Sequence, residues 1–338
     1  MIQAALKTLL NRNDLTEEEM TAVMQQIMSG QATDAQIAGF LIALRMKGET
    51  PTEITAAANV MRSLSSGVSV DQPYLVDTCG TGGDGLSTFN VSTTVAFVAA
   101  AAGAQVAKHG NRSVSSSSGS ADVLKAAGIN IELGAEAVGR CIDALGVGFM
   151  FAPMHHSAMK HAIGPRRELG VYTLFNLLGP LTNPASAPNQ VMGVFAEQWL
   201  EPIAEVLKAL GSRHVMVVHA ADGLDEISPA GDTHVVEMKA GEIQRYTLNP
   251  TQFDLECGAV EDMQVEDAEA SLAMVESVLA GTPGAALTTV LLNAGAAIYV
   301  SGVAGSIADG VKMAQDAVGS GLAKEKFKEY RQMTQLFL

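Results

Sequence analysis

A glycine-rich loop and the polar residues after it are the part of the sequence best suited to bind an anion. Gly80, Gly82, Gly83 and Gly85 fall within six residues, directly after a short apolar run. Glycine lets the backbone turn sharply and bring its N–H groups close to a ligand. A helix expected over 90–102 would add the positive end of its dipole at the same place. The loop therefore predicts a phosphate-binding site.

A second polar segment follows the next apolar run and carries cations and hydroxyl groups. Lys108 and Arg112 precede a serine-rich stretch over 113–120, and a helix is expected over 121–127. A serine run by itself is more often a flexible linker than a ligand site. Next to two cations and a glycine loop, it indicates a second phosphate-binding loop.

Two familiar nucleotide-binding motifs fit this region poorly. The spacing Gly80-x-Gly82-x-x-Gly85 matches the dinucleotide fingerprint, which also needs an acidic residue about 20 positions further on. No Asp or Glu occurs between Asp84 and Asp122. A Walker A loop places lysine after its last glycine, where this chain has Leu86. Nicotinamide-dependent and simple nucleotide-hydrolysing enzymes are therefore disfavoured.

The segment 152–161 contains three histidines, His155, His156 and His161. It lacks the helical pair with a nearby carboxylate that zinc sites often use. Neutral imidazole offers a flat face and a polar edge. We interpret these residues as one wall of a site for an aromatic substrate rather than as metal ligands.

Two adjacent arginines, Arg166 and Arg167, follow shortly afterwards. Neighbouring positions on a helix point in different directions, so the two side chains cannot share one face. Arginine can hold a carboxylate through two parallel hydrogen bonds. On composition alone, surface ion pairs would account for both residues.

The loop 222–228 contains the adjacent carboxylates Asp225 and Glu226. Such a pair repels unless a cation lies between its members, and oxygen ligands of this kind suit Mg²⁺. A solvated acidic turn is the alternative interpretation. The phosphate-binding loops upstream favour a phosphate-bound Mg²⁺.

Composition limits the classes of partner. The chain has 36 acidic and 21 basic residues and a net charge of −15, which argues against nucleic acid or an anionic membrane. No secretory leader is apparent, and the alanine-rich run 95–102 is far shorter than the ~20 residues that span a bilayer. The three cysteines show no metal-ligand spacing and suggest reduced thiols of a cytoplasmic protein.

The first part of the chain has the pattern of a small helical domain. Capping sequences that begin at Thr16, Thr33 and Thr50 each precede apolar residues at helical spacing. We expect three helices here, in a domain over residues 1–70 that is joined by about 165–188.

From residue 74 to 338, short apolar runs alternate with helical stretches. This alternation is typical of an α/β domain with a doubly wound, mostly parallel sheet, whose ligands bind beyond the carboxyl ends of the strands. The expected strands lie at 75–76, 105–107, 148–151, 191–195, 214–218 and 234–236. The expected late helices lie at 267–279, 287–300, 307–318 and 324–338.

The segments 77–85, 90–93 and 108–112 together resemble the signature of the anthranilate phosphoribosyltransferase family, and the resemblance extends over the whole chain. It implies a nucleoside phosphorylase/phosphoribosyltransferase-like fold. It also implies transfer of the phosphoribosyl group from phosphoribosyl pyrophosphate to the amine of anthranilate in tryptophan biosynthesis. Diphosphate would leave with Mg²⁺, and catalysis would rest on electrostatic positioning without a covalent enzyme intermediate.

The resemblance also implies roles for individual residues. Those expected to bind the phosphoribosyl donor are Gly80, Gly83, Asp84, Thr88, Asn90, Val91, Ser92, Thr93, Lys108, Ser116 and Ser120. Those expected to face anthranilate are Gly80, Asn111, His156 and Arg166. Two Mg²⁺ ions per site are expected on Ser92, Asp225 and Glu226. Lys108 and His109 are the catalytic candidates, with His109 as a possible acceptor of the amine proton.

The sequence leaves two alternative functions open, and the resemblance implies one assembly. A pyrimidine nucleoside phosphorylase has a similar glycine loop but no need for the Asp225–Glu226 pair. A non-catalytic nucleic-acid-binding relative would need a basic surface, which the charge of −15 opposes. The resemblance further implies a homodimer through the N-terminal helices, whose apolar stripes are compatible with that contact.

Overall fold

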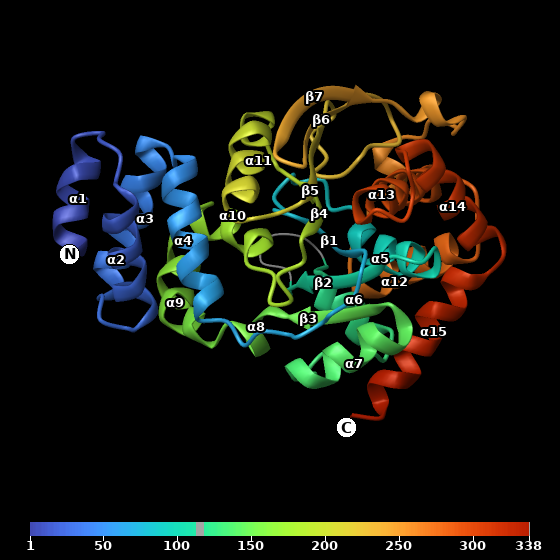
Figure 1. Ribbon diagram of the computed structural model, residues 1–338, viewed down its shortest axis with the longest axis horizontal. Coiled ribbons are helices and arrows are strands. Elements are labelled where there is room, and N and C mark those ends of the chain that lie inside the picture. The colour runs from blue at the N-terminus through green and yellow to red at the C-terminus, as the bar shows by residue number, and fades with distance from the viewer. Residues whose placement is uncertain (113–117, 338) are drawn as a thin grey trace.

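The computed structural model describes residues 1–112 and 118–337, and in it one sheet separates two hydrophobic cores. Successive residues of a strand point to opposite faces. In the central strands Val191 and Met216 join one core, whereas Met192 and Val217 join the other. The sheet is therefore covered on both faces, as expected for a doubly wound fold (Figure 1).

The sheet has seven strands in the order β3-β2-β1-β4-β5-β6-β7, and its first five members in this order pair in parallel. β6 and β7 are antiparallel. The strands are β1 (Leu75–Gly80), β2 (Gln105–Gly110), β3 (Val147–Phe151), β4 (Asn189–Gly193), β5 (His214–Ala220), β6 (Thr233–Lys239) and β7 (Glu242–Leu248). The mostly parallel sheet is confirmed. The order reverses between β1 and β4, which is where open α/β sheets form a crevice for ligands.

One strand was not expected from the sequence. β7 is joined to β6 by a two-residue turn, Ala240–Gly241, in which both residues have positive φ (51° and 85°). Its residues are exposed along most of its length, so it lacks the apolar alternation of a half-buried strand. β7 forms the outer edge of the sheet.

Helices on the two faces have different neighbours. α11 (Leu200–Ala209) packs on β5 and β6, and α13 (Ala285–Ser301) packs on β4 and β1. Figure 1 shows α13 and the later helices on the side opposite the N-terminal helices. The other helices after β1 are α5 (Val91–Ala101), α6 (Ser120–Ala126), α7 (Ala135–Leu145), α8 (Ala152–His155), α9 (Lys160–Leu169), α10 (Leu174–Leu181), α12 (Ala268–Leu279), α14 (Ile307–Gly319) and α15 (Leu322–Gln335).

Four helices, not three, open the chain and lie together at one end of the molecule (Figure 1). They are α1 (Ile2–Leu10), α2 (Glu17–Met28), α3 (Asp34–Lys47) and α4 (Pro51–Ser63). The three expected capping boxes begin α2, α3 and α4. α1 escaped prediction because its N-cap is Met1, which makes no side-chain capping bond.

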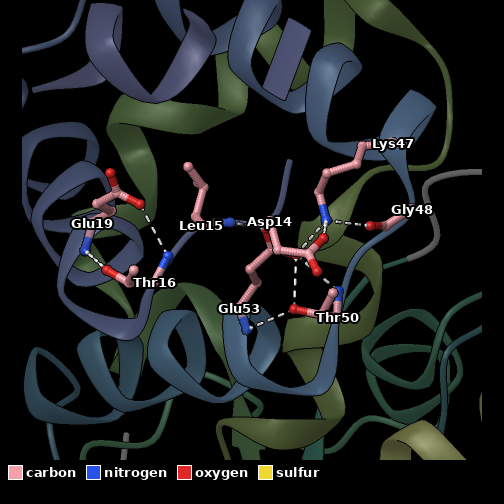
Figure 2. A network of polar contacts seen from close by, with 8 residues as sticks. All are labelled: Asp14, Leu15, Thr16, Glu19, Lys47, Gly48, Thr50 and Glu53. Atoms are coloured by element: carbon pink, nitrogen blue, oxygen red, sulfur yellow. Dashed lines mark hydrogen bonds and ion pairs between the residues drawn. The ribbon is translucent and has the colours of Figure 1, made fainter. Parts of the chain in front are cut away.

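A buried carboxylate connects two loops of this helical bundle (Figure 2). Glu53 is fully buried and accepts hydrogen bonds from the Leu15 backbone N–H at 2.9 Å and from the Thr50 backbone N–H at 2.8 Å. The Lys47 ammonium pairs with Glu53 at 2.9 Å and with Asp14 at 2.7 Å. The loop before α2 and the loop before α4 are thereby held to one another.

In the described part of the chain, no helix is both long enough and apolar enough to cross a membrane.

Candidate active site

The glycine loop begins where β1 and β4 end side by side. Gly80 and Gly193 are paired in the register of these strands, and neither position has room for a side chain. A Cβ on Gly80 would lie 3.0 Å from the Asp225 Cγ, and one on Gly193 would overlap the Asp225 backbone. Asp225 also accepts a hydrogen bond from the Gly82 N–H at 2.8 Å. The glycines thus let the loop after β5 seat its carboxylate against the glycine loop.

Three carboxylates gather at this edge of the sheet. Burial and the charge of Asp84 raise the pKa of Asp225 to about 7. Burial and the charge of Asp225 raise the pKa of Glu226 well above its ordinary value, although Lys108 opposes this. Oxygen ligands held close together at such a cost fit a divalent cation.

These residues do not form a complete metal cage by themselves. Within residues 1–112 and 118–337, no group of three or more His, Cys, Asp or Glu side chains is arranged to hold a metal ion. Mg²⁺ is commonly held by one or two carboxylates together with substrate phosphates. The donor set therefore suits a cation that arrives with a phosphorylated ligand.

Lys108 lies beneath the start of α5. Its ammonium donates to the Thr78 carbonyl at 2.6 Å and to the Ser92 hydroxyl at 3.1 Å, and the residue is only 3% exposed. Burial lowers the pKa of Lys108, whereas the charge of Asp77 opposes that effect. The cation therefore fixes the position of Ser92, one of the expected metal ligands.

Asp77 is a site residue whose importance the sequence did not reveal. It is 1% exposed, and its Oδ1 accepts from the His109 backbone N–H at 3.2 Å. Its Oδ2 has no hydrogen-bond partner among the described residues. Burial raises the pKa of Asp77 despite the nearby Lys108. The signal that could have revealed Asp77 in the sequence is an acidic residue directly after the apolar residues Leu75 and Val76.

Asn90, one of the expected donor-binding residues, makes tertiary contacts through its side chain. It is the N-cap of α5 but makes no side-chain capping bond. Its side chain instead accepts from the hydroxyls of Ser118 at 3.0 Å and Ser271 at 2.7 Å. These tertiary contacts replace the local cap and tie α5 to the second loop and to α12.

Three other residues expected to bind the donor, Thr88, Val91 and Thr93, lie at or just before the start of α5. Val91 and Thr93 are buried, and the Thr93 hydroxyl has no partner in the described part of the chain. Thr88 precedes them in an isolated bridge to Gln264. The Thr78 hydroxyl of β1 donates to the Ser92 carbonyl at 3.1 Å, so the start of α5 lies against the carboxyl-terminal part of β1.

The second loop is described at its two ends. Asn111 accepts from the Arg112 backbone N–H at 2.8 Å through its Oδ1. Its carbonyl accepts from the Ser120 hydroxyl at 3.1 Å, so these two candidates lie together. Ser116 lies outside the described residues.

Two neutral imidazoles line the region beyond β2. The rings of His109 and His156 are 5.1 Å apart. Burial, aided by the neighbouring His156, lowers the pKa of His109 to about 3, and burial lowers the pKa of His156 to about 4. His109 Nδ1 lies 3.1 Å from the Gly179 carbonyl. Since a carbonyl only accepts, Nδ1 carries the proton and Nε2 keeps a free lone pair.

Arg166 and Arg167 occupy distinct environments, as their adjacent positions predicted. Arg167 is exposed, whereas Arg166 is partly buried and has its guanidinium carbon 5.2 Å from the centre of the Phe175 ring. Burial lowers the pKa of Arg166. The described residues provide no ion-pair partner for Arg166, so its charge is available to an anionic ligand.

Comparisons with known proteins agree with this geometry. A family described as "Glycosyl transferase family, helical bundle domain" matches residues 3–65, and "Glycosyl transferase family, a/b domain" matches residues 72–324. The anthranilate phosphoribosyltransferase of Thioalkalivibrio sulfidiphilus is 61% identical over 97% of each chain.

Solved structures give the same result. The crystal structure of the anthranilate phosphoribosyltransferase from Thermus thermophilus is similar with a TM-score of 0.92 and 42% identity, over 98% of this chain and 99% of that one. The Saccharomyces cerevisiae enzyme in complex with PRPP and Mg has a TM-score of 0.90 and 26% identity, over 99% and 98% of the respective chains.

Proposed function

Because the chain belongs to the anthranilate phosphoribosyltransferase family, we propose that it transfers the phosphoribosyl group from phosphoribosyl pyrophosphate to the amine of anthranilate. The observation that carries the proposal is the meeting of Asp225 and Glu226 with the glycine loop and the start of α5. A pyrimidine nucleoside phosphorylase does not need such a pair, and no comparison favours that function.

The donor's phosphates would be held by backbone and side-chain groups at the crevice between β1 and β4. The N-terminus of α5 offers the positive end of its dipole. Lys108 adds a cation close to Ser92. The glycine loop, with Gly80 and Gly83, allows close approach of the backbone.

Magnesium dependence is part of the proposal. Asp225 and Glu226 would hold one ion and Ser92 would contribute to a second, as the acidic cluster and the Lys108-positioned hydroxyl support. When bound, Mg²⁺ neutralises the departing diphosphate and orients it. The carboxylates, whose raised pKa values reflect burial and then mutual repulsion, gain a counter-charge when the donor arrives.

Anthranilate would lie against Asn111, His156 and Arg166. The uncompensated guanidinium of Arg166 suits the carboxylate, and the neutral His156 ring suits the aromatic face. The arylamine loses a proton during the reaction, and His109 Nε2 has the free lone pair to accept it. His109 is already neutral at pH 7, since burial lowers its pKa to about 3.

The direct test is diphosphate release from phosphoribosyl pyrophosphate and Mg²⁺, measured with and without anthranilate. The proposal expects release only when both substrates are present. Phosphorolysis of thymidine or uridine, without anthranilate-dependent release, would assign the rival function instead.

A second test concerns acceptor recognition. Arg166→Ala should raise the anthranilate KM by about 10- to 100-fold, as expected from the ~1.5 to 3 kcal/mol of a charged hydrogen bond. Arg167→Ala is the matched control and should leave the KM unchanged. Aniline, which lacks the carboxylate, should lose little further on mutation. The opposite ranking of the two variants would move the carboxylate site to Arg167.

The proposal extends to organisation and location. Phe175 of α10 joins the same hydrophobic core as the N-terminal helices, which supports grouping 165–188 with residues 1–70. Leu10 and Met46 are 75% and 73% exposed on those helices and could be covered in a homodimer, which sedimentation would test. The three free cysteines are in keeping with a cytoplasmic enzyme.

A further inference from the structure

Tyr172 joins two parts of the candidate active site that are distant in sequence. It lies between α9, which carries Arg166, and α10. Its hydroxyl oxygen rests against Gly83 of the glycine loop, where an added Cβ would overlap it and would lie 2.7 Å from the Tyr172 Cε2. The absence of a side chain at Gly83 therefore provides the space that Tyr172 fills.

The position of Tyr172 is fixed on several sides. α9 ends at Leu169, its C-cap Gly170 has the left-handed conformation, and α10 begins after its N-cap Thr173, so the linker between them is short. The Tyr172 ring packs on Phe195 with a centroid distance of 4.9 Å. The Phe195 backbone N–H donates in turn to the Thr81 hydroxyl at 3.0 Å. Tyr172 and Phe195 thus contact the glycine loop at two neighbouring points.

The glycine loop needs support of this kind. Gly82, Gly83 and Gly85 all have positive φ, at 65°, 88° and 74°, and glycine loses more conformational freedom on ordering than other residues. Among residues 1–112 and 118–337, an added Cβ would meet nothing within 4 Å at Gly82 or Gly85, in contrast to Gly83. Tyr172 therefore packs on the middle of the loop at Gly83, next to the hydrogen bond that Gly82 donates to Asp225.

We propose that Tyr172 is a positioning residue that holds the glycine loop in its donor-binding conformation and links that loop to α9. This inference rests on the proposed function, because it assigns the donor's phosphates to the glycine loop. It adds a residue that neither the glycine motif nor the acidic pair indicates.

Removal of the side chain should affect the donor selectively. Tyr172→Ala is expected to raise the KM for phosphoribosyl pyrophosphate about 10- to 30-fold, since loss of sub-ångström positioning is costly. The anthranilate KM and kcat at saturating donor should change by less than about threefold, because Arg166 and the carboxylates remain in place. Tyr172→Phe keeps the ring packing and should restore most of the donor affinity. Val171→Ala, at a neighbouring side chain that is 51% exposed, is the control and should behave like the natural chain.

A double-mutant cycle tests the contact itself. Gly83→Ala and Gly85→Ala both place alanine at positive φ and carry similar backbone strain, but only the former meets Tyr172. In the Tyr172→Ala background, the increase in donor KM caused by Gly83→Ala should shrink by at least about fivefold. The increase caused by Gly85→Ala should be the same in both backgrounds.

Two results would overturn the inference. One is a Gly83→Ala effect that is equal in both backgrounds, and the other is an unchanged donor KM in folded Tyr172→Ala. If that variant does not fold, Tyr172→Leu provides the background for the same cycle, because it also removes the ring and hydroxyl atoms that an added Cβ at Gly83 would meet. Calorimetric binding of the donor with Mg²⁺ and without anthranilate gives the comparison independently of turnover. Donor binding without anthranilate-dependent diphosphate release would reject the proposed function alone.

Discussion

Buried carboxylates at the two ends of the parallel strands are held in opposite ways. At the carboxyl end, Asp225 and the partly buried Glu226 lie close to Asp84, and burial together with mutual repulsion raises the pKa of both acids. The hydrogen bond from Gly82 to Asp225 only partly offsets this cost. Without a bound cation, the negative charges of these carboxylates at the carboxyl end of the sheet are not balanced.

At the amino end of β5, Glu237 is 2% exposed and fully engaged in hydrogen bonds. It accepts from His214 Nε2 at 2.7 Å, from the Tyr246 hydroxyl at 2.8 Å, from the Tyr299 hydroxyl at 2.9 Å and from the Gln244 amide at 3.1 Å. Burial alone would raise the pKa of Glu237, but the bonds from His214 and the two tyrosines lower it to about 2.

The difference separates two uses of a buried acid. Glu237 is surrounded by donors and stabilises the packing of β5, β6, β7 and α13. Asp225 is surrounded by acids and destabilises the unliganded protein, as expected where a site is shaped for a ligand. One acid should therefore matter for stability and the other for activity.

The largest effect is expected for Asp225→Asn. The amide can still accept from the Gly82 N–H, but it removes the charge that Mg²⁺ requires. We expect kcat to fall about 100- to 1,000-fold, the scale at which electrostatic groups act in catalysis. Steady-state diphosphate release over a magnesium titration measures this. Near-normal turnover at low magnesium would remove Asp225 from the metal site.

The next prediction concerns pH. The pKa of Asp225 is raised in the folded protein from an ordinary 3.8 to about 7, so the folded state binds more protons between these values. Stability should therefore fall as pH rises through this window, by on the order of 2 to 4 kcal/mol. Asp225→Asn should lose less, and so should be the more stable protein at pH 8. Urea unfolding at pH 5 and pH 8 without Mg²⁺ tests this, and parallel losses in both proteins would contradict it.

Glu237→Gln should lower stability and leave activity nearly unchanged, the reverse of what is expected for Asp225→Asn. Loss of the charge leaves His214 and the tyrosines with a weaker acceptor and should cost about 2 kcal/mol of unfolding free energy. Both substrate KM values and kcat should stay within about twofold, since the residue lies away from the crevice. Chemical denaturation and steady-state assays on one preparation give both answers. A large loss of turnover with unchanged stability would contradict the interpretation that Glu237 matters for stability and Asp225 for activity.

The smallest effect is expected for Tyr246→Phe, which removes one of the bonds to Glu237. The expected loss is about 1 kcal/mol. The lowered pKa of Glu237 stabilises the fold above its ordinary value of 4.5, and this contribution is lost as pH falls toward 2. The variant should therefore unfold in acid at a higher pH than the natural chain. An acid titration followed by circular dichroism measures the shift, and coincident curves would show that Tyr246 adds nothing.

Local patterns in the sequence predicted much of this architecture. The capping boxes at Thr16, Thr33 and Thr50 formed as expected, because the groups that make them are three residues apart. The acidic pair Asp225–Glu226 and the glycine loop could likewise be identified from the sequence. β7 was missed because polar side chains occupy both of its faces, and its pairing with β6 is a tertiary effect.

Contacts across the fold could not be predicted in the same way. Asn90 is the N-cap of α5, but its side chain bonds to Ser118 and Ser271 instead of capping the helix, since those partners arrive only with the folded chain. The contact of Tyr172 with Gly83 depends likewise on how α9 and α10 pack. The sequence identified groups that could bind the ligands, whereas the residues that hold those groups in place emerged from packing.

The turn between β6 and β7 gives the enzyme a natural attachment point for a reporter protein. Ala240 and Gly241 close this hairpin at the outer edge of the sheet, and exposed hairpin tips are among the sites where inserted domains are best tolerated. A fluorescent domain grafted at 240–241 would thus turn the fold into a cellular probe of its own abundance, with the crevice between β1 and β4 left open.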